Sequence, residues 1–293
     1  MLYFAYGSNL DARDRRSWCK KNGVDDFLEG SGRVGYLPDT ELVFHYRSSV
    51  RAGGALNIRQ CRGQLTPGVL FEVDARGWAL LDRKERVPHY YRRRPVQVLT
   101  DCGEQVAAVT YEVLPEHREG FVSPTNDYVD TVRRGLHEFG LTDALLTAAA
   151  TASDSPAPWL VDRVFVYGTL MRGECRHQSL QADAEILHAL PAKTKGRLLD
   201  LGAFPGLVPA VEQGEQVVGE YYRVMDIGLT LGTLDQIEEF RGYGIEGSLY
   251  TRVLAQLDTE TGATQVAWTY HLSEIPPSAT VIPSGSWRSR SAR

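Results

Sequence analysis

The sequence predicts two tandem α+β domains, each a small mixed β-sheet or barrel flanked by a few helices. A short hydrophobic strand that runs into a glycine turn occurs twice, once at the start and once after residue 160. The two copies read Tyr3-Phe4-Ala5-Tyr6-Gly7-Ser8-Asn9-Leu10 and Val164-Phe165-Val166-Tyr167-Gly168-Thr169-Leu170-Met171. Further features follow both copies in the same order, and a stretch of linker composition separates them. A recurrence of this kind indicates a duplicated fold.

The features downstream of each turn are a strand, a helical stretch with an acidic end, a tyrosine–arginine motif and a last strand. They occupy residues 68–74, 81–85, 90–92 and 106–111 in the first half, and 218–224, 234–238, 250–252 and 266–270 in the second. The expected strands are 2–6, 42–46, 54–58, 68–73, 96–100 and 107–114, then 163–167, 195–200, 216–224, 251–257 and 266–271. Many strands with few helices and no regular alternation favour an α+β fold.

A helix over residues 127–141 is expected to complete the first domain. Apolar Tyr128, Val132, Leu136 and Phe139 recur at helical spacing, and Gly140 ends the pattern. We place domain 1 at residues 1–146, a linker at 147–160, domain 2 at 161–275 and an extended carboxy-terminal tail at 276–293. The linker is rich in small residues and proline, which is typical of a connection between domains.

Composition narrows the classes of function. The 293 residues are 43% hydrophobic and 24% charged, with a formal charge of −5, which is typical of a globular protein. No basic stripe interleaved with aromatics is present, so we expect no nucleic-acid partner. The four cysteines and seven histidines show no metal-ligand spacing, and we expect no metal. Without a signal peptide or an apolar run long enough to cross a membrane, the expected location is cytoplasmic, with no membrane partner.

Glu85 and Glu238 are the candidate catalytic residues. Each ends a Leu-Asp-x-x-Glu run, in which the aspartate and the glutamate share one helix face. A carboxylate beside a free amine can take up its proton and return it to a leaving group. The alternative is a solvated helix face, on which this pattern is common.

The glycine turns are the complementary candidates. Tyr6-Gly7-Ser8 and Tyr167-Gly168-Thr169 place backbone N–H groups beside a hydroxyl. Such amides can bind a carboxylate or polarise a carbonyl without a charged side chain. The alternative is a tight strand-to-loop turn that has only a structural role.

Together these motifs resemble the gamma-glutamylcyclotransferase-like superfamily in two copies. The first half is similar to gamma-glutamylcyclotransferase through its opening motif, through Gly53-Gly54-Ala55, and through Leu81-Asp82-x-x-Glu85 with the segment 124–141. The second half is similar to the gamma-glutamylamine cyclotransferase branch, through residues 167–173, 196–208 and Leu234-Asp235-x-x-Glu238. The resemblance covers nearly the whole chain.

The resemblance implies a cofactor-independent transferase reaction on a small gamma-glutamyl substrate. The substrate's own α-amine attacks its γ-carbonyl, which releases 5-oxoproline and a free amine or amino acid. Glu85 and Glu238 would relay the proton. The residues implied to contact substrate are Tyr3, Phe4, Ala5, Tyr6, Gly7, Ser8 and Tyr128 in the first site, and Tyr167, Gly168, Thr169 and Leu170 in the second.

Two departures and one hypothesis accompany the resemblance. Arg86 replaces the family's glycine after the catalytic glutamate, so we expect a different loop path there. The second half lacks a counterpart of the 124–128 segment. Basic neighbours of Glu85 predict a preference for anionic partners, whereas Asp235 and Glu239 near Glu238 predict a raised proton affinity and a preference for cationic ones.

Other functions stay open at this point. The chain could be a non-catalytic protein that binds gamma-glutamyl ligands, or it could hold one active and one degenerate domain. An amidohydrolase that uses water would release free glutamate in place of 5-oxoproline.

Overall fold

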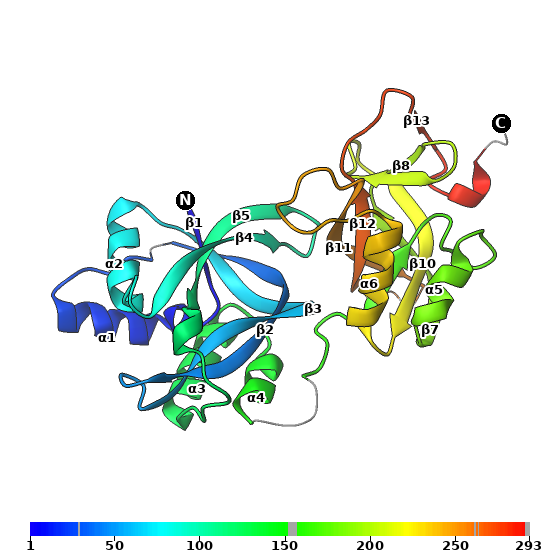
Figure 1. Cartoon of the computed structure of the whole chain (residues 1–293). Helices are drawn as coiled ribbons and strands as arrows, with labels where there is room; N and C mark the ends of the chain where they lie inside the picture. Colours follow the sequence, from blue (N-terminus) through cyan, green and yellow to red (C-terminus); the bar gives the residue numbers. More distant parts are fainter. Residues whose placement is uncertain (29, 152–156, 261, 263, 291–293) are drawn as a thin grey trace. The chain divides into compact units, whose positions relative to one another are not determined.

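The computed structural model of the chain describes residues 1–28, 30–151, 157–260, 262 and 264–290. The chain divides into two compact units, one of Met1–Thr100 with Gln105–Leu160 and one of Asp101–Glu104 with Val161–Arg293. Each unit contains a closed five-stranded barrel (Figure 1). The expected α+β class with a small barrel in each half is therefore confirmed.

The first unit contains five strands, four α-helices and two short 3-10 helices among its described residues. In chain order they are β1 (Leu2–Ala5), η1 (Ser8–Leu10), α1 (Ala12–Asn22), β2 (Arg33–Ser48), β3 (Gly53–Glu72), α2 (Ala75–Glu85), β4 (Tyr91–Leu99), β5 (Gln105–Val113), η2 (Pro115–His117), α3 (Asn126–Glu138) and α4 (Ala144–Ala150). The strand order around the barrel is β1-β3-β2-β4-β5, and a parallel contact between β1 and β5 closes it. The helix expected at 127–141 is α3.

The second unit contains eight strands, two α-helices and one 3-10 helix among its described residues. They are β6 (Arg163–Val166), α5 (His177–Asp183), β7 (Ile186–Lys195), β8 (Arg197–Asp200), β9 (Pro205–Val208), β10 (Gln216–Val224), α6 (Ile227–Ile237), β11 (Tyr250–Thr259), β12 (Gln265–Leu272), β13 (Thr280–Val281) and η3 (Trp287–Ser289). The barrel order is β10-β6-β12-β11-β7, and β8, β9 and β13 form a separate small sheet. When each barrel is followed from the strand that precedes its glycine turn, β1 or β6, the strand orders of the two barrels are equivalent.

The long strands of the first unit differ from the sequence-based expectation. Residues 54–58 and 68–73 were expected as two strands, but 54–58 and 68–72 belong to the single 20-residue strand β3, which pairs with the 16-residue β2. The strands β7 and β9 of the second unit were not expected as such. Turn-forming residues within a strand suggest, from the sequence alone, that the strand ends there. In the structure, pairing with a neighbouring strand keeps the strand continuous.

The regions expected as linker and tail contain ordered structure. Helix α4 extends to Ala150, and Gln64 donates a hydrogen bond to the carbonyl of Pro158 at 3.0 Å. Residues 152–156 lie outside the described part of the chain. In the expected tail, β13 pairs with β8 and the side chain of Trp287 is buried.

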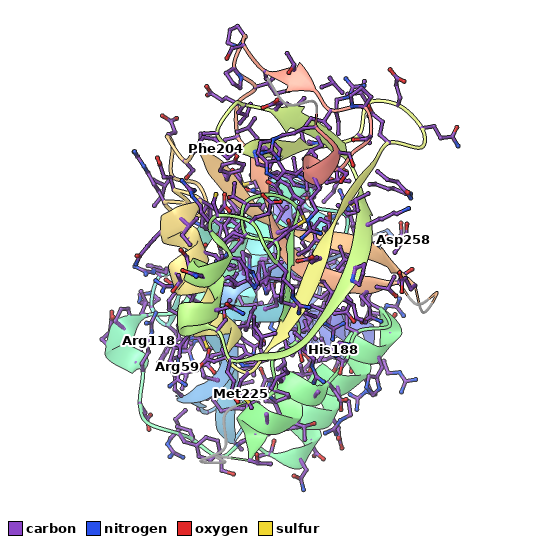
Figure 2. All side chains as sticks on the ribbon, turned by 90° about the vertical axis from the view of Figure 1, so that its right-hand side faces the viewer. Arg59, Arg118, His188, Phe204, Met225 and Asp258 are labelled. Atoms are coloured by element: carbon purple, nitrogen blue, oxygen red, sulfur yellow. The ribbon has the colours of Figure 1, made fainter. Side chains whose placement is uncertain are left out.

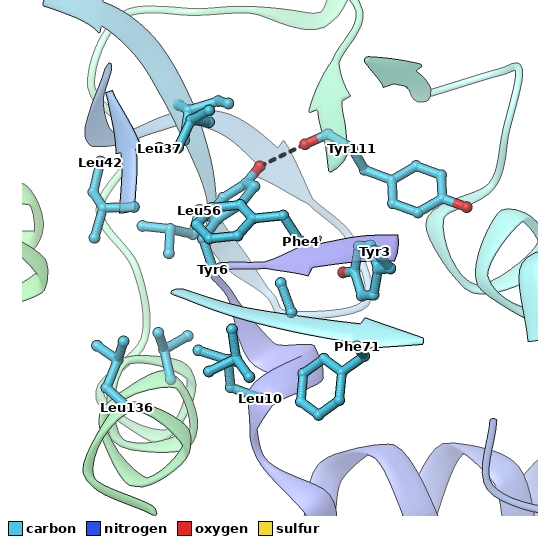
Figure 3. Packing of buried hydrophobic residues seen from close by; sticks show 14 of the residues in the cluster. Tyr3, Phe4, Tyr6, Leu10, Leu37, Leu42, Leu56, Phe71, Tyr111 and Leu136 are labelled. Carbon is cyan, nitrogen blue, oxygen red and sulfur yellow. Dashed lines mark hydrogen bonds between the residues drawn. The ribbon is translucent and has the colours of Figure 1, made fainter. Parts of the chain in front are cut away.

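A core of aromatic and aliphatic side chains fills the first barrel and extends beneath helix α3 (Figure 3). The hydroxyl of Tyr6 donates to the carbonyl of Tyr111 at 2.8 Å, which joins the end of β1 to β5. The second unit repeats this bond, since Tyr167 donates to the carbonyl of Tyr270 at 2.8 Å. The equivalence of the two halves therefore extends to individual side chains.

Helices α2 and α6, which carry the two Leu-Asp-x-x-Glu runs, are fixed at each end in the same way. Asp74 caps the start of α2 by accepting from the amide of Gly77, and Asp226 caps the start of α6 by accepting from the amide of Leu229. Near the far end, a second aspartate accepts hydrogen bonds from a tyrosine and an arginine of the barrel strands. We call this three-residue arrangement the aspartate clamp; its members are Asp82, Arg93 and Tyr111 in the first half and Asp235, Arg252 and Tyr270 in the second.

The aspartate clamps have closely similar geometry. Asp82 accepts from the Tyr111 hydroxyl at 2.7 Å and from two Arg93 nitrogens at 2.8 Å. Asp235 accepts from the Tyr270 hydroxyl at 2.7 Å and from Arg252 at 2.8 Å. The expected match of residues 90–92 with 250–252 is therefore one residue out of register, because Arg93, and not Arg92, is the counterpart of Arg252.

The clamp arginines differ in burial, and this difference predicts unequal effects on stability. Arg252 has a fully buried side chain, so Arg252→Met should remove the counter-charge of a largely buried Asp235 and cost about 3–5 kcal/mol. Arg93 is 37% exposed, and Arg93→Met should cost only about 0.2–1 kcal/mol. Urea unfolding curves of the two variants and the unaltered chain measure both values; equal losses would contradict this account.

Candidate active sites

The first glycine turn lies between strand β1 and helix α1 and is fixed from several sides. The amide of Leu10 donates to the carbonyl of Gly7 at 3.0 Å. The buried guanidinium of Arg15 donates to the carbonyl of Asn9 at 2.8 Å and is paired with Asp26 at 2.5 Å. The backbone of the turn is thus held by a buried cation as well as by its own hydrogen bonds.

Helix α3 packs directly on this turn because Gly135 has no side chain. A Cβ atom at Gly135 would lie 2.5 Å from the Cβ of Leu10 and 2.7 Å from the amide nitrogen of Asp11, which is too close for any other residue. Arg134, the preceding residue, reaches across to Asp11 at 2.7 Å. The helix that carries Tyr128 is therefore positioned against the turn.

Glu85 is the last residue of α2, and its carboxylate contacts the turn. The side-chain amide of Asn9 donates to Oε1 of Glu85 at 2.9 Å and to the Tyr3 hydroxyl at 2.8 Å. Lys84 donates to the Oδ1 atom of the same asparagine at 2.6 Å, and its side chain is only 7% exposed. Asn9 lies in the predicted glycine turn but was not singled out as a site residue, whereas Lys84 was among the basic neighbours of Glu85.

Glu85 lines a cavity of about 300 Å³ together with residues of the turn, the β2–β3 hairpin and helix α3. Its lining consists of Ser8, Trp18, Asn22, Tyr46, Ser48, Val50, Arg51, Ala55, Arg83, Lys84, Glu85, Arg86, Tyr90, Tyr91 and Tyr128. Polar and aromatic side chains dominate the lining, and several of them are cationic. The cavity can therefore accommodate a polar ligand of amino-acid size.

Arg51 lines this cavity and is another residue that sequence reasoning missed. Its guanidinium pairs with both oxygens of Asp14 at 2.7 Å, donates to the hydroxyl of Ser8 at 3.1 Å and lies 4.9 Å from the ring centre of Tyr128. The residue lies in the turn between β2 and β3, far from the other site residues in sequence. Only the pairing of these strands brings it to the glycine turn.

The tyrosines around Glu85 keep their hydroxyl protons. Burial raises the pKa of Tyr3, Tyr6, Tyr91 and Tyr128, and the negative charge of Glu85 raises each further. Burial lowers the pKa of the Lys84 ammonium, while Glu85 and Asp14 oppose that shift. The phenol groups can therefore donate hydrogen bonds at any physiological pH.

The second glycine turn is shaped by contact with a proline. A Cβ atom at Gly168 would lie 2.4 Å from the ring of Pro205, so only glycine permits this approach. The carbonyl of Thr169 accepts from the amide of Arg176 at 2.9 Å, and a ring nitrogen of His177 lies 3.0 Å from the carbonyl of Leu170. These contacts hold the start of α5 against the turn.

Glu238 immediately follows α6 and lines a cavity with the second turn. The lining consists of Val164, Phe165, Val166, Tyr167, Gly168, Thr169, Leu170, Arg176, Phe204, Pro205, Leu234, Ile237, Glu238, Glu239, Leu249, Tyr250 and Tyr270. The cavity measures about 70 Å³ and is lined by both apolar and polar groups; Phe204, one of its aromatic walls, is labelled in Figure 2. It is smaller than the cavity of the first half.

Burial raises the pKa of Glu238 to about 7, and the nearby positive charge of Arg176 partly opposes the shift. The expectation of a raised proton affinity is correct in direction, but its expected cause is wrong. Asp235 is neutralised by Arg252 in the aspartate clamp. Burial of the carboxyl group, and not its acidic neighbours, accounts for the effect.

The residue after each glutamate has the left-handed backbone conformation that normally favours glycine. Arg86 has φ 57° and Glu239 has φ 52°. A residue with a side chain costs about 1 kcal/mol there. The guanidinium of Arg86 lies 4.0 Å from the ring centre of Tyr90, a favourable cation–π contact that offsets part of this cost.

Comparison with known proteins assigns the family. The model of the family described as gamma-glutamyl cyclotransferase, AIG2-like, matches residues 3–130 and again 164–289. The chain belongs to the gamma-glutamyl cyclotransferase family. It contains that family's domain twice in tandem.

Individual relatives cover parts of the chain. The gamma-L-glutamyl-butirosin B gamma-glutamyl cyclotransferase of Niallia circulans is 37% identical over 108 residues, which are 36% of this chain and 64% of that relative. A Vibrio cholerae protein provisionally named a gamma-glutamylcyclotransferase is 36% identical over 127 residues, or 43% of this chain and 96% of the relative. A solved structure of an uncharacterized protein from Homo sapiens is 25% identical with a TM-score of 0.43, covering 54% of this chain and 92% of its own.

The residues that the resemblance implied to contact substrate have two kinds of surroundings. Some line the cavities, and some are buried in the barrels or form hydrogen bonds within the protein. Ser8 and Tyr128 line the first cavity, and Tyr167, Gly168, Thr169 and Leu170 line the second. Phe4 and Ala5 are fully buried in the barrel, and Tyr3, Tyr6 and Tyr167 use their hydroxyls in the internal bonds described above. The roles of all these residues in substrate binding stay predictions.

The described residues contain neither a cluster of potential metal ligands nor a helix suited to crossing a membrane. No three histidine, cysteine, aspartate or glutamate side chains gather there in a way that could hold a metal ion. In the same part of the chain, none of the helices has the length and apolarity needed to cross a membrane.

The raised pKa of Glu238 predicts a pH-dependent stability. The folded state holds this proton up to about pH 7, whereas an unfolded glutamate loses it near its ordinary pKa of 4.5, so stability falls as pH rises between these values. Glu238→Gln removes the effect and should be more stable than the unaltered chain above pH 7, by up to about 3 kcal/mol. This advantage should disappear below pH 4.5.

Denaturant unfolding at pH 4, 6 and 8.5 measures the difference. The exposed Glu274 lies in the same unit, and Glu274→Gln is the matched control for loss of one negative charge. A pH-independent difference between Glu238→Gln and the unaltered chain would contradict the assignment.

Proposed function

We propose that each half binds a small gamma-glutamyl compound and cleaves it by ring closure, releasing 5-oxoproline and a free amine or amino acid. The observation that supports this most strongly is the repeated arrangement of a helix-end carboxylate and a glycine turn lining one cavity. Membership of the cyclotransferase family supports the general reaction. The substrate and the product are the parts that we propose.

The proposed reaction balances within the substrate. The α-amine nitrogen attacks the γ-carbonyl carbon, and a new C–N bond closes a five-membered ring. The glutamate takes the proton from the attacking nitrogen and gives it to the leaving nitrogen, after which the original amide C–N bond breaks. The protein returns to its starting state, so no covalent intermediate with the protein and no cofactor are needed.

The protein's contribution to this reaction is geometric and electrostatic. An intramolecular attack needs the extended glutamyl chain folded so that its two ends meet, which a closed cavity can impose. Backbone amides of the glycine turn can stabilise negative charge on the carbonyl oxygen as the tetrahedral intermediate forms. Protonated tyrosines such as Tyr91 and its counterpart Tyr250 line the same cavities and can orient the glutamyl group.

We further propose that the halves differ in the partner released. The first cavity contains Arg51, Arg83 and Arg86, which favour a leaving group with a carboxylate. Among the residues lining the second cavity, Arg176 is the one arginine, and Glu238 and Glu239 are acidic. This balance favours an amine without a carboxylate, including cationic ones.

Single and double glutamate variants test both parts of the proposal. Glu85→Gln and Glu238→Gln each remove the proton relay of one half and should lower that half's rate about 10²–10⁴-fold. We expect Glu85→Gln to lose turnover of gamma-glutamyl-glutamate and Glu238→Gln to lose turnover of gamma-glutamyl-lysine. Mass spectrometry of released 5-oxoproline measures both rates.

Charge-matched controls are Glu116→Gln and Glu274→Gln, which alter exposed residues outside both cavities. The double variant at Glu85 and Glu238 should release 5-oxoproline about 10²–10⁴-fold more slowly from both substrates. Full activity of the double variant would refute the catalytic role, and binding of both substrates without any turnover by the unaltered chain would favour a binding protein. Identical preferences of the two single variants would end the proposed division of partners.

A further inference from the structure

The two candidate active sites differ in polarity at two equivalent positions, one in the glycine turn and one on the helix next to the glutamate. Asn9 follows the turn residue Ser8, and Leu170 follows its counterpart Thr169. Lys84 precedes Glu85, and Ile237 precedes Glu238. A polar pair in the first half thus corresponds to an apolar pair in the second.

Shared contacts fix this equivalence independently of the local sequence. The bonds from Tyr6 to Tyr111 and from Tyr167 to Tyr270 align the two turns. The aspartate clamps align the two helix ends, because each clamp aspartate lies three residues before its glutamate. The polar and apolar pairs therefore occupy the same places beside their glutamates.

In the first half, Lys84 determines how Asn9 faces the glutamate. The ammonium group can only donate, so the atom of Asn9 that it contacts at 2.6 Å is the acceptor Oδ1. The amide nitrogen then points to the other side, where it donates to Glu85 at 2.9 Å and to Tyr3 at 2.8 Å. Lys84 is itself held near Asp14, at 3.8 Å.

In the second half, neither member of the pair can donate or accept a side-chain hydrogen bond. Leu170 and Ile237 line the cavity beside Glu238 and contribute only hydrocarbon surface. Arg176 provides the opposing positive charge, which does not overcome the effect of burial on the glutamate. A carboxyl group in such surroundings is favoured in its neutral form.

Other charged and titratable groups also surround the two glutamates. Those that act on Glu85 or are acted on by it are Tyr3, Tyr6, Tyr46, Tyr91, Tyr128, Lys84 and Arg51. Those near Glu238 are Tyr167, Tyr250, Tyr270, Arg176, Glu239 and Asp235. Both sets combine protonated tyrosines with arginine. The first cavity contains Arg83 and Arg86 besides Arg51, whereas Arg176 is the one arginine that lines the second. The Asn–Lys and Leu–Ile pairs are the contrast at equivalent positions next to the glutamates.

We propose that Asn9 and Lys84 are positioning residues that orient the side chain of Glu85 toward the first cavity, and that the apolar Leu170 and Ile237 at the equivalent places give Glu238 no such hydrogen-bonding partner. The duplication would then have produced two sites on one backbone plan that work best at different pH. The consequence for turnover rests on the proposed function, whereas the consequence for proton binding does not.

Introducing the asparagine–lysine pair at the equivalent positions of the second half tests the proposal without any enzyme assay. The chain labelled with ¹³C at glutamate carboxyl groups is titrated by NMR, and the Glu238 resonance is assigned by its absence in Glu238→Gln. The double variant Leu170→Asn/Ile237→Lys should bind this proton at least tenfold more weakly, moving the midpoint from about 7 to 6 or lower. The single variant Ile237→Lys should give part of the shift.

Two controls separate positioning from a general effect of charge or substitution. Gln236→Lys adds the same charge at the exposed neighbouring residue, and Leu170→Met/Ile237→Met keeps the pair apolar at similar size. Both should leave the midpoint near its original value. A shift with Gln236→Lys as large as with Ile237→Lys would overturn the role assigned to this position.

The reciprocal variants address the first half. Asn9→Leu/Lys84→Ile should move the titration of Glu85 to higher pH, and the conservative Lys84→Arg should retain most of the original behaviour. An unchanged Glu85 titration in a folded Asn9→Leu/Lys84→Ile chain would refute the proposal, and Asn9→Ser provides a milder variant if the double change does not fold. Because titration requires no turnover, an inactive chain that shows these shifts would refute only the proposed function.

Discussion

The aspartate clamp is the constraint on which both candidate sites depend. In each half, one carboxylate at the end of the acidic helix accepts from a tyrosine and an arginine on adjacent barrel strands. The glutamate follows three residues later, at the point where the helix ends. Fixing the aspartate to the barrel therefore fixes where the glutamate can reach. The other end of the site is fixed by β1 or β6, because the glycine turn is the direct continuation of a barrel strand.

This arrangement separates the placement of the glutamate from its chemical environment. The aspartate clamp and the tyrosine bond that joins the turn strand to the barrel are the same in both halves, whereas the groups that contact the glutamate differ. Asn9 donates to Glu85 and accepts from Lys84, whereas the equivalent residues Leu170 and Ile237, which line the cavity of Glu238, have apolar side chains. A duplicated gene can change such contact residues without disturbing the fold, since they are not part of the frame that positions the helix. The cost in stability of a buried, ionisable Glu238 is a common property of functional carboxyl groups.

The sequence predicted the features that depend on local pattern. The duplication, the fold class, helix α3 and most strands follow from hydrophobic periodicity and repeated motifs. Features that depend on pairing over long distances were not accessible. The single strand β3 appeared as two, and the tyrosine–arginine motif was aligned one residue out of register because three consecutive arginines, Arg92 to Arg94, gave no sign of which one meets Asp82. Arg51 joins the first site only because β2 and β3 pair. The raised pKa of Glu238 was expected from neighbouring charges, but it arises from burial, which a sequence does not report.

The most direct measurement of the central claim is the fate of solvent oxygen during turnover. If each half closes the ring by intramolecular attack, reaction of a gamma-glutamyl amine in H₂¹⁸O should give 5-oxoproline without ¹⁸O, both in the unaltered chain and in the chain that retains only Glu85 or only Glu238. Mass spectrometry of the products distinguishes the outcomes. Free glutamate carrying one ¹⁸O atom, as hydrolysis by water would give, would contradict the account.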